Sequence, residues 1–190
     1  NEINYYIQIC ENMLITRDEL KRRIKANEYG RLDEVTKQKL ISKTEYDIVD
    51  FVKNPILIKN ISNYANISEK ILQKLILEDL PSFMKELGSG FSFIENEYKI
   101  KIGNNYNYVD LLLYNIKFKC YVVIELKVTE LKKEHIGQIQ IYMNYIDNNI
   151  KKVNQGKTIG IIICKKDNKF IMEYCSDDRI FSKEYKLLFS

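Results

Sequence analysis

The first part of the chain carries apolar residues at helical spacing, separated by many charged residues. Thr16 and Glu19 stand at the spacing of a capping box, which predicts a charged helix from there to about Asn27. A second stretch with a helical pattern covers about residues 33–43. We therefore expect the chain to begin with a helical segment.

A connector and a longer helix are predicted next. The stretch FVKNPILIKN contains Pro55 and is interpreted as the connector. Ser68 stands at the N-cap of an apolar helical pattern, SEKILQKLILEDLPSFMKELG. We expect Pro81 to kink this helix and Gly88 to end it.

From Phe91 onward the apolar residues recur with a period of two, which is typical of strands. Three such runs follow one another, GFSFIENEYKIKI, YNYVDLLLY and FKCYVVIELKV. Gly103 and two asparagines mark a turn between the first two runs, and Asn115 lies near a second tight turn. These short connections favour an antiparallel meander.

A helix over about residues 133–147 precedes TIGIIICKK, whose unbroken apolar run suits a strand covered on both faces. The sequence DNK is interpreted as a hairpin that leads into an edge strand, FIMEYCS. The order α-β-β-β-α-β-β predicts the α/β class, with helices packed on a mixed sheet. We expect residues 1–66 to form the helical segment and residues 67–190 the domain that contains the sheet.

The length of 190 residues suits one compact domain or one domain plus a helical arm. With 45% apolar and 29% charged residues, the composition indicates a soluble protein with a core. No run approaches the roughly 20 apolar residues of a membrane span, and no signal peptide is recognisable. Four cysteines without zinc-like spacing favour a reducing compartment. We therefore expect a cytoplasmic protein with no membrane partner. The chain does not begin with Met, which suggests a fragment of a longer protein.

Three charged residues interrupt the apolar strands: Asp110, Glu125 and Lys127. Glu125 and Lys127 share one face of their strand, and an antiparallel pairing brings Asp110 close to Glu125. Two converging carboxylates repel each other unless a cation lies between them. Mg²⁺ suits such a pair, and an adjacent ammonium can position an attacking water and stabilise phosphoryl charge. The alternative is an ordinary surface pair of Glu125 with Lys127.

The helix that follows adds two candidates. Gln138 and Tyr142 stand at i and i+4, so they share a helical face, and the helix starts a few residues beyond Lys127. They could hold a phosphate or a water. The alternative is that Tyr142 packs in the core and Gln138 is an exposed helix former. His135, the single histidine, is interpreted as a helix-start residue, and it excludes sites built on paired histidines.

The set Asp110, Glu125-Leu126-Lys127 and Gln138-x-x-x-Tyr142 resembles the PD-(D/E)xK nuclease superfamily with its QxxxY extension. More closely, LGSGFSFIENEYKI, YVDLLLYNIKFKCYVVIELKV, GQIQIYMNYID and TIGIIICK resemble the bacterial YhcG-type PDDEXK nuclease family, over about residues 68–178. The first helical stretch resembles the end of that family's N-terminal region. Val109 stands where the superfamily name has Pro.

The resemblance implies a restriction-endonuclease-like fold and a role for each matching residue. Asp110 and Glu125 would bind Mg²⁺ or Mn²⁺ with the backbone carbonyl of Leu126. Lys127 would orient the water or stabilise the transition state. Gln138 and Tyr142 would complete the catalytic site. The superfamily often adds an acidic residue from the preceding helix, and Glu78 aligns best, although helical periodicity places Asp79 nearer the apolar centre.

Basic residues suggest where a nucleic acid would bind. Arg17, Lys21 and Lys25 form a stripe at i, i+4 and i+8 on the first predicted helix. A solvated face is one interpretation of the stripe, and contact with DNA phosphates is the other. Lys132 and Lys133 lie beside the predicted site and could steer a phosphate backbone. The net charge of +4 permits such a partner without demanding one.

The sequence therefore predicts a metal-dependent DNA nuclease, with water attacking the phosphodiester in line. The first alternative is a catalytically silent module of the same fold that binds DNA or proteins, and a weaker one is an RNA hydrolase. The family resemblance implies a role in bacterial DNA metabolism, alongside restriction or defence-system proteins. The helical segment could pair chains into a homo-oligomer or recruit such partners.

Overall fold

The computed structural model describes residues 1–189, which fall into two compact units, Asn1–Asn54 and the chain from Pro55 onward. Each unit has its own core. Within the described residues, no helix combines the length and apolar character needed to cross a lipid bilayer.

The first unit is helical, as predicted. It contains α1 (Glu2–Met13), α2 (Arg17–Lys25) and α3 (Glu34–Ser42). Thr16 caps α2, since its side-chain oxygen accepts a hydrogen bond from the Glu19 N–H at 3.2 Å. Tyr5, Tyr6 and Leu32 are buried together and form the core of this unit.

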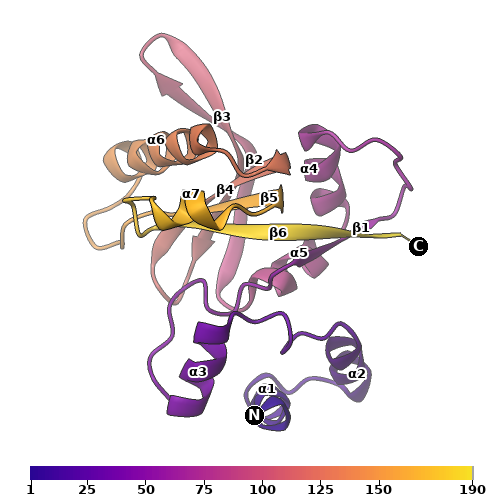
Figure 1. The fold of residues 1–190 in the computed structure, drawn as a ribbon. Helices are drawn as coiled ribbons and strands as arrows, with labels where there is room; N and C mark the ends of the chain where they lie inside the picture. Colours follow the sequence, from indigo (N-terminus) through magenta and orange to yellow (C-terminus); the bar gives the residue numbers. More distant parts are fainter. Residues whose placement is uncertain (190) are drawn as a thin grey trace. The chain divides into compact units, whose positions relative to one another are not determined.

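The second unit is built on a six-stranded mixed sheet in the order β1-β6-β5-β4-β3-β2 (Figure 1). The predicted meander is confirmed, because β2 pairs with β3 and β3 with β4 in antiparallel fashion. The remaining pairs, β4 with β5, β5 with β6 and β6 with β1, are parallel. The strands are β1 (Ile56–Asn60), β2 (Phe91–Ile102), β3 (Asn105–Asn115), β4 (Cys120–Glu130), β5 (Ile159–Lys166) and β6 (Ile180–Phe189).

Four helices accompany this sheet: α4 (Glu69–Glu78), α5 (Leu80–Leu87), α6 (Lys133–Asn149) and α7 (Lys169–Glu173). The core on the α6 side joins Ile139 and Met143 of α6 with Val123 of β4. Ile124 and Leu126 point to the other face of β4 and are also fully buried. The central strand is therefore covered on both faces, and the mixed sheet flanked by helices confirms the predicted α/β class.

The predicted kink in the long helix is a complete break. α4 begins after Ser68, whose side chain accepts the Ile71 N–H, and it ends at Glu78. Asp79 then caps α5 by accepting the Ser82 N–H. Pro81 lies in the first turn of α5, where its missing N–H costs no helical hydrogen bond.

The connector prediction was wrong at its second half. Ile56–Asn60 forms β1, which pairs in parallel with β6 and buries Ile56 and Ile58. Pro55 immediately precedes this strand, where a proline interrupts no ladder hydrogen bond. The compact unit that holds the sheet therefore begins at residue 55, whereas the sequence placed the boundary between residues 66 and 67.

The prediction for the C-terminal part was also wrong. The stretch expected as an edge strand forms α7, because Asn168 accepts the Ile171 N–H and so caps a helix instead of starting a hairpin. The last strand is β6, which runs parallel to β5 after this short crossover. A hairpin could only have produced an antiparallel neighbour.

Candidate active site

The site forms where β3 and β4 separate. Their pairing runs from Asn115 opposite Cys120 to Leu111 opposite Ile124, and the next positions are Asp110 and Glu125. Here the Asp110 carboxylate replaces a backbone acceptor, since its Oδ2 accepts the Leu126 N–H at 2.7 Å. The splayed strands thus leave a gap that the two carboxylates line.

The backbone at Asp110 is fixed from a second side. The Gln73 side chain of α4 donates a hydrogen bond from Nε2 to the Asp110 carbonyl oxygen at 2.9 Å. Gln73 itself is buried, so the bond is shielded from water. α4 therefore positions the strand that carries the first carboxylate.

Glu125 is buried, with 1% of its surface exposed, and its Oε1 accepts no hydrogen bond from the residues that the structure describes. Burial, and after it the negative charge of Asp110, raise the pKa of Glu125 to about 8, although Lys127 opposes the shift. Burial also raises the pKa of Asp110, while the Leu126 N–H and Lys127 oppose that rise. Two carboxylates held in this way favour either a proton or a cation between them.

Lys127 is also buried, and its ammonium lies between two acidic side chains. Its Nζ is 3.5 Å from Oε2 of Glu125 and 3.7 Å from Oε2 of Glu69, at the start of α4. Glu69 is half exposed, so solvent partly screens its ion pair with Lys127. The lysine is held close to Glu125 without sharing its free oxygen, Oε1.

The donor set suits a hard divalent cation. The free Oε1 of Glu125 and the carboxylate of Asp110 supply oxygen ligands of the kind that Mg²⁺ and Mn²⁺ prefer. The Leu126 carbonyl faces the same gap, because the N–H and C=O of one strand residue point to the same side. No cluster of three or more His, Cys, Asp or Glu side chains with metal-binding geometry occurs in residues 1–189. Backbone and water oxygens would therefore have to complete the shell.

Gln138 and Tyr142 lie on α6 and bond to each other, with Nε2 of Gln138 donating to the Tyr142 hydroxyl at 3.2 Å. Tyr142 is buried in the core between α6 and the sheet. In the described part of the chain, neither side chain forms a hydrogen bond with Asp110, Glu125 or Lys127. Both interpretations of this pair, core packing and a contribution to the site, therefore stay open.

The N-terminus of α6 reaches the site through His135. Its Nδ1 accepts the Lys132 N–H at 3.1 Å, so it closes the first turn as predicted for a helix-start residue. Burial, followed by the positive charge of Lys127, lowers its pKa. Lys132 and Lys133 are exposed on the same turn.

Comparison with known proteins agrees with this geometry. The profile of the YhcG PDDEXK nuclease domain family matches residues 49–189, which is most of the chain. The chain belongs to this family. It is also similar to an Escherichia coli (strain K12) protein named "Putative nuclease YhcG", with 24% identity over 139 residues. That match covers 72% of this chain and 37% of the relative, so the chain spans little more than a third of the relative's length.

Two solved structures align with part of this chain. A repair endonuclease from Pyrococcus abyssi aligns with a TM-score of 0.45 and 18% identity, over 64% of this chain and 48% of that one. The structure of an EndoMS–dsDNA complex aligns with a TM-score of 0.42 and 20% identity, over 66% of this chain and 48% of that one.

In the YhcG family member described here, the acidic residue of α4 that contacts Lys127 is Glu69, whereas the residue expected near the site was Glu78. Glu78 lies at the far end of α4, roughly 13 Å along the axis from Glu69, and its partner is Lys74 at 3.8 Å. Asp79 is a cap that also pairs with Lys59, so it is not at the site either. Glu69 is the acidic residue of α4 that reaches Lys127, and the position directly after the Ser68 cap was the overlooked signal.

The predicted DNA stripe lies on the other compact unit of this YhcG-type chain. Arg17, Lys21 and Lys25 are exposed on α2, as either interpretation requires. Their neighbours Arg22 and Arg23 are ion-paired with Glu19 at 2.7 and 3.1 Å.

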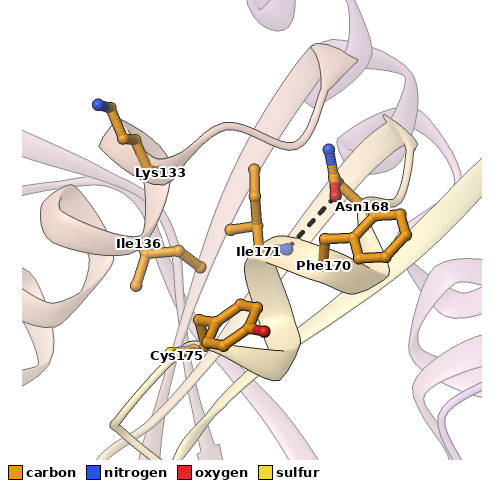
Figure 2. A pocket seen from close by; sticks show the side chains of 7 residues that line it. Lys133, Ile136, Asn168, Phe170, Ile171 and Cys175 are labelled. Carbon is orange, nitrogen blue, oxygen red and sulfur yellow. Dashed lines mark hydrogen bonds between the residues drawn. The ribbon is translucent and has the colours of Figure 1, made fainter.

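A cavity of about 480 Å³ adjoins the end of β4. Figure 2 shows Ile136 of α6 and Ile171 of α7 facing the same space, with Asn168 bonded to the Ile171 N–H. Asn168 also donates to Glu130, the last residue of β4, at 3.1 Å. The lining has no carboxylate, so the cavity is distinct from the gap between Asp110 and Glu125. It comprises Lys133, Ile136, Asn168, Phe170, Ile171, Tyr174 and Cys175.

Proposed function

We propose that this chain is a divalent-metal-dependent nuclease that hydrolyses phosphodiester bonds of DNA. The observation that carries the proposal is the buried Glu125, whose Oε1 has no hydrogen-bond partner in the described residues and whose neighbours are Asp110 and Lys127. A carboxylate that is buried with an unused oxygen costs stability, so its presence in a central strand calls for a ligand.

Asp110, Glu125 and the Leu126 carbonyl would hold the cation. Mg²⁺ or Mn²⁺ bound there would supply positive charge for a non-bridging phosphate oxygen and for an attacking water. The chain itself fixes these ligands: Leu126 holds Asp110 through its N–H, and the packed strand β4 holds Glu125. Such positioning lowers the cost of ordering the reactants.

Lys127 would act on the phosphate. Its ammonium is held 3.5 Å from Glu125 Oε2, where it would orient the water and stabilise the negative charge that grows on the phosphoryl oxygens. The water oxygen would attack phosphorus and release a proton to solvent, while the ester P–O bond on the opposite side breaks in line and the departing oxygen takes up a proton from solvent. Gln138 and Tyr142 would support the site from α6, with Lys132 and Lys133 steering the DNA backbone toward it.

A second candidate is a catalytically silent module that keeps the fold and binds DNA or proteins. Without a cation, the raised pKa of Glu125, about 8, favours a protonated carboxyl at neutral pH, and a metal ion would have to displace that proton. DNA binding that is insensitive to a chelator and occurs without cleavage would support this alternative. RNA hydrolysis is a weaker alternative, which belongs in the same substrate panel.

The test is a cleavage assay on linear, nicked, branched and single-stranded DNA and on RNA, with Mg²⁺ or Mn²⁺ and with EDTA. We expect metal-dependent DNA cleavage that Glu125→Ala and Lys127→Ala both abolish while the circular dichroism spectrum stays native. Cleavage that survives both substitutions would refute the mechanism. The same panel would separate endonuclease from exonuclease activity.

A further inference from the structure

The hairpin of β2 and β3 extends beyond the rest of the sheet. β3 pairs with β4 only over residues 111–115, whereas β2 and β3 continue to pair out to Ile102 opposite Asn105. Residues 98–109 therefore form a two-stranded ribbon, which Figure 1 shows projecting past β4. Gly103, with φ +59, forms the turn at its tip.

The two faces of this ribbon differ. Ile100 and Val109 are buried in the core on the α6 side, and Tyr98 packs against the same cluster. The opposite face carries two cross-strand pairs, Lys99 with Tyr108 and Lys101 with Tyr106. Because neighbouring residues of a strand alternate between faces, these four side chains share one surface.

That surface is open. Tyr106 is 56% exposed and Tyr108 is 52% exposed, and both lysines are exposed as well. Lys99 Nζ lies 3.8 Å from the centre of the Tyr106 ring, and Lys101 Nζ lies 5.9 Å from it. These cation–π contacts reduce the freedom of the two lysines.

The outer part of the ribbon is basic. Residues 98–109 include two lysines and no Asp or Glu, and the acidic residues Glu97 and Asp110 flank this range at the end nearer the site. Interleaved ammonium groups and exposed aromatic rings match the chemistry of a nucleic-acid strand, in which lysines neutralise phosphates and tyrosines pack against sugars or bases. A protein partner would instead favour an apolar centre depleted in lysine.

The exposed face also leads directly to the candidate active site. Tyr108 precedes Asp110 by two residues and Tyr106 by four, which corresponds to roughly 7 and 13 Å along the strand. One DNA strand advances about 3.4 Å per nucleotide, so these side chains could contact the backbone two to four nucleotides from a phosphate at Asp110. This spacing is consistent with contacts to the same DNA strand that is cleaved.

We propose that the exposed face of the ribbon, Lys99, Lys101, Tyr106 and Tyr108, is a binding surface for the substrate DNA backbone beside the scissile phosphate. This inference rests on the proposed nuclease function, and it assigns substrate contact to residues outside the nuclease motif. It predicts that DNA must extend several nucleotides past the cut on one side.

Binding is measured by fluorescence anisotropy with a 30-nucleotide DNA, as single strand and as duplex, in EDTA so that no cleavage occurs. We expect Lys99→Ala with Lys101→Ala to weaken binding about fivefold per lysine near 0.15 M salt and to reduce the salt slope by about 2. Tyr106→Ala with Tyr108→Ala should weaken it further, and Tyr→Phe at both positions should restore stacking. The matched control is Lys117→Ala with Lys119→Ala, which removes the same charge at the opposite end of β3.

The proposal would be overturned if the ribbon and control variants lost DNA affinity equally, or if neither lost any. If the wild-type chain still cleaves DNA in that case, the nuclease function stands. Absence of any DNA binding by the wild-type chain would overturn both. A second measurement uses the wild-type chain and so does not depend on the folding of variants. It compares the acetylation of Lys99 and Lys101 with and without the oligonucleotide. DNA should protect both lysines and leave Lys117 unprotected, and unprotected ribbon lysines would refute the contact.

Discussion

The Asp110 carboxylate accepts the backbone N–H of Leu126 at 2.7 Å, at the point where the ladder between β3 and β4 ends. One side chain therefore has two tasks. It satisfies a backbone donor that the splayed strands leave without a partner, and it presents its other oxygen to the gap beside Glu125. The proposed metal binding would therefore be coupled to stability at this residue.

Asp110→Asn and Asp110→Ala should separate those two tasks. Asparagine can still accept the Leu126 N–H, so we expect a free energy of unfolding close to that of the wild type and a complete loss of cleavage. Alanine leaves the N–H unpaired and should lower the free energy of unfolding by about 1–3 kcal/mol as well. Urea unfolding in EDTA, followed by circular dichroism, gives the comparison. Equal destabilisation of both variants would contradict the role of the side chain as a backbone acceptor.

Glu125 should make the metal-free protein less stable as pH rises. Its pKa is about 8 in the folded chain, above the usual value of 4.5, so the folded state binds a proton more tightly than the unfolded state. The stability from this proton is complete below about pH 4.5 and is lost as pH rises through 8. The expected loss between pH 5 and pH 9 is on the order of 3 kcal/mol.

Glu125→Gln is the matched comparison, because glutamine cannot titrate. In EDTA, thermal unfolding of the variant should depend less on pH over this range than that of the wild type. Added Mg²⁺ should stabilise the wild type at pH 8 and have little effect on the variant, since a ligand that binds only the folded state raises its stability. Parallel pH profiles for the two proteins would exclude the raised pKa.

Lys127 should be needed for cleavage more than for binding. Its ammonium is buried beside Glu125, where it can stabilise charge that develops only in the transition state. We expect Lys127→Ala to slow single-turnover cleavage about 100-fold or more, with a small change in the dissociation constant for DNA. Lys74→Ala, on the exposed surface of α4, is the control and should cleave like the wild type.

Glu69, not Glu78, should be the acidic residue of α4 that affects activity. Glu69 lies 3.7 Å from Lys127 Nζ, whereas Glu78 pairs with Lys74 at the other end of the helix. Glu69→Gln should lower the cleavage rate about tenfold, as removal of a supporting charge near a metal site often does. Glu78→Gln is isosteric and should leave the cleavage rate unchanged. If Glu78→Gln slowed cleavage more than Glu69→Gln did, Glu78 would be the functional acidic residue of α4, as the family alignment suggests.

Truncation should reveal where the sheet-bearing unit begins. A chain that starts at residue 55 keeps β1, whereas one that starts at residue 67 removes Ile56 and Ile58 from the core and exposes the edge of β6. Each lost isoleucine is worth about 2 kcal/mol, a large share of the stability of a typical domain. We expect a cooperative melting transition for the longer fragment and a much lower melting temperature, or aggregation, for the shorter one.

The meander and the three charged residues on it could be predicted from sequence because each depends on local signals. The alternation of apolar and polar residues predicted the strands, and the turn at Gly103 predicted that they run antiparallel. Antiparallel pairing then predicted that Asp110 lies close to Glu125. β1 could not be predicted in this way, since a five-residue edge strand after a proline has the same local pattern as a connector and is defined only by its partner, β6.

Glu69 was missed for a similar reason. Helical periodicity ranks residues by their closeness to the apolar face of a helix, whereas Glu69 contacts Lys127 from the first turn of α4. α7 was mistaken for a strand because its apolar residues are few and its start depends on one cap, Asn168. Each of these features depends on contacts between residues that are distant in the sequence or on a single capping bond, which local patterns do not predict.

β2 forms one edge of the sheet, and its regularity is broken twice. Its register shifts between Phe93 and Glu95, and Glu97 adopts a left-handed conformation with φ 50. A straight edge of twelve residues would invite pairing with another chain, and kinks and charges along it discourage that. The irregular edge should therefore keep the protein soluble at high concentration, and smoothing it by Glu97→Val would favour aggregates joined through β2.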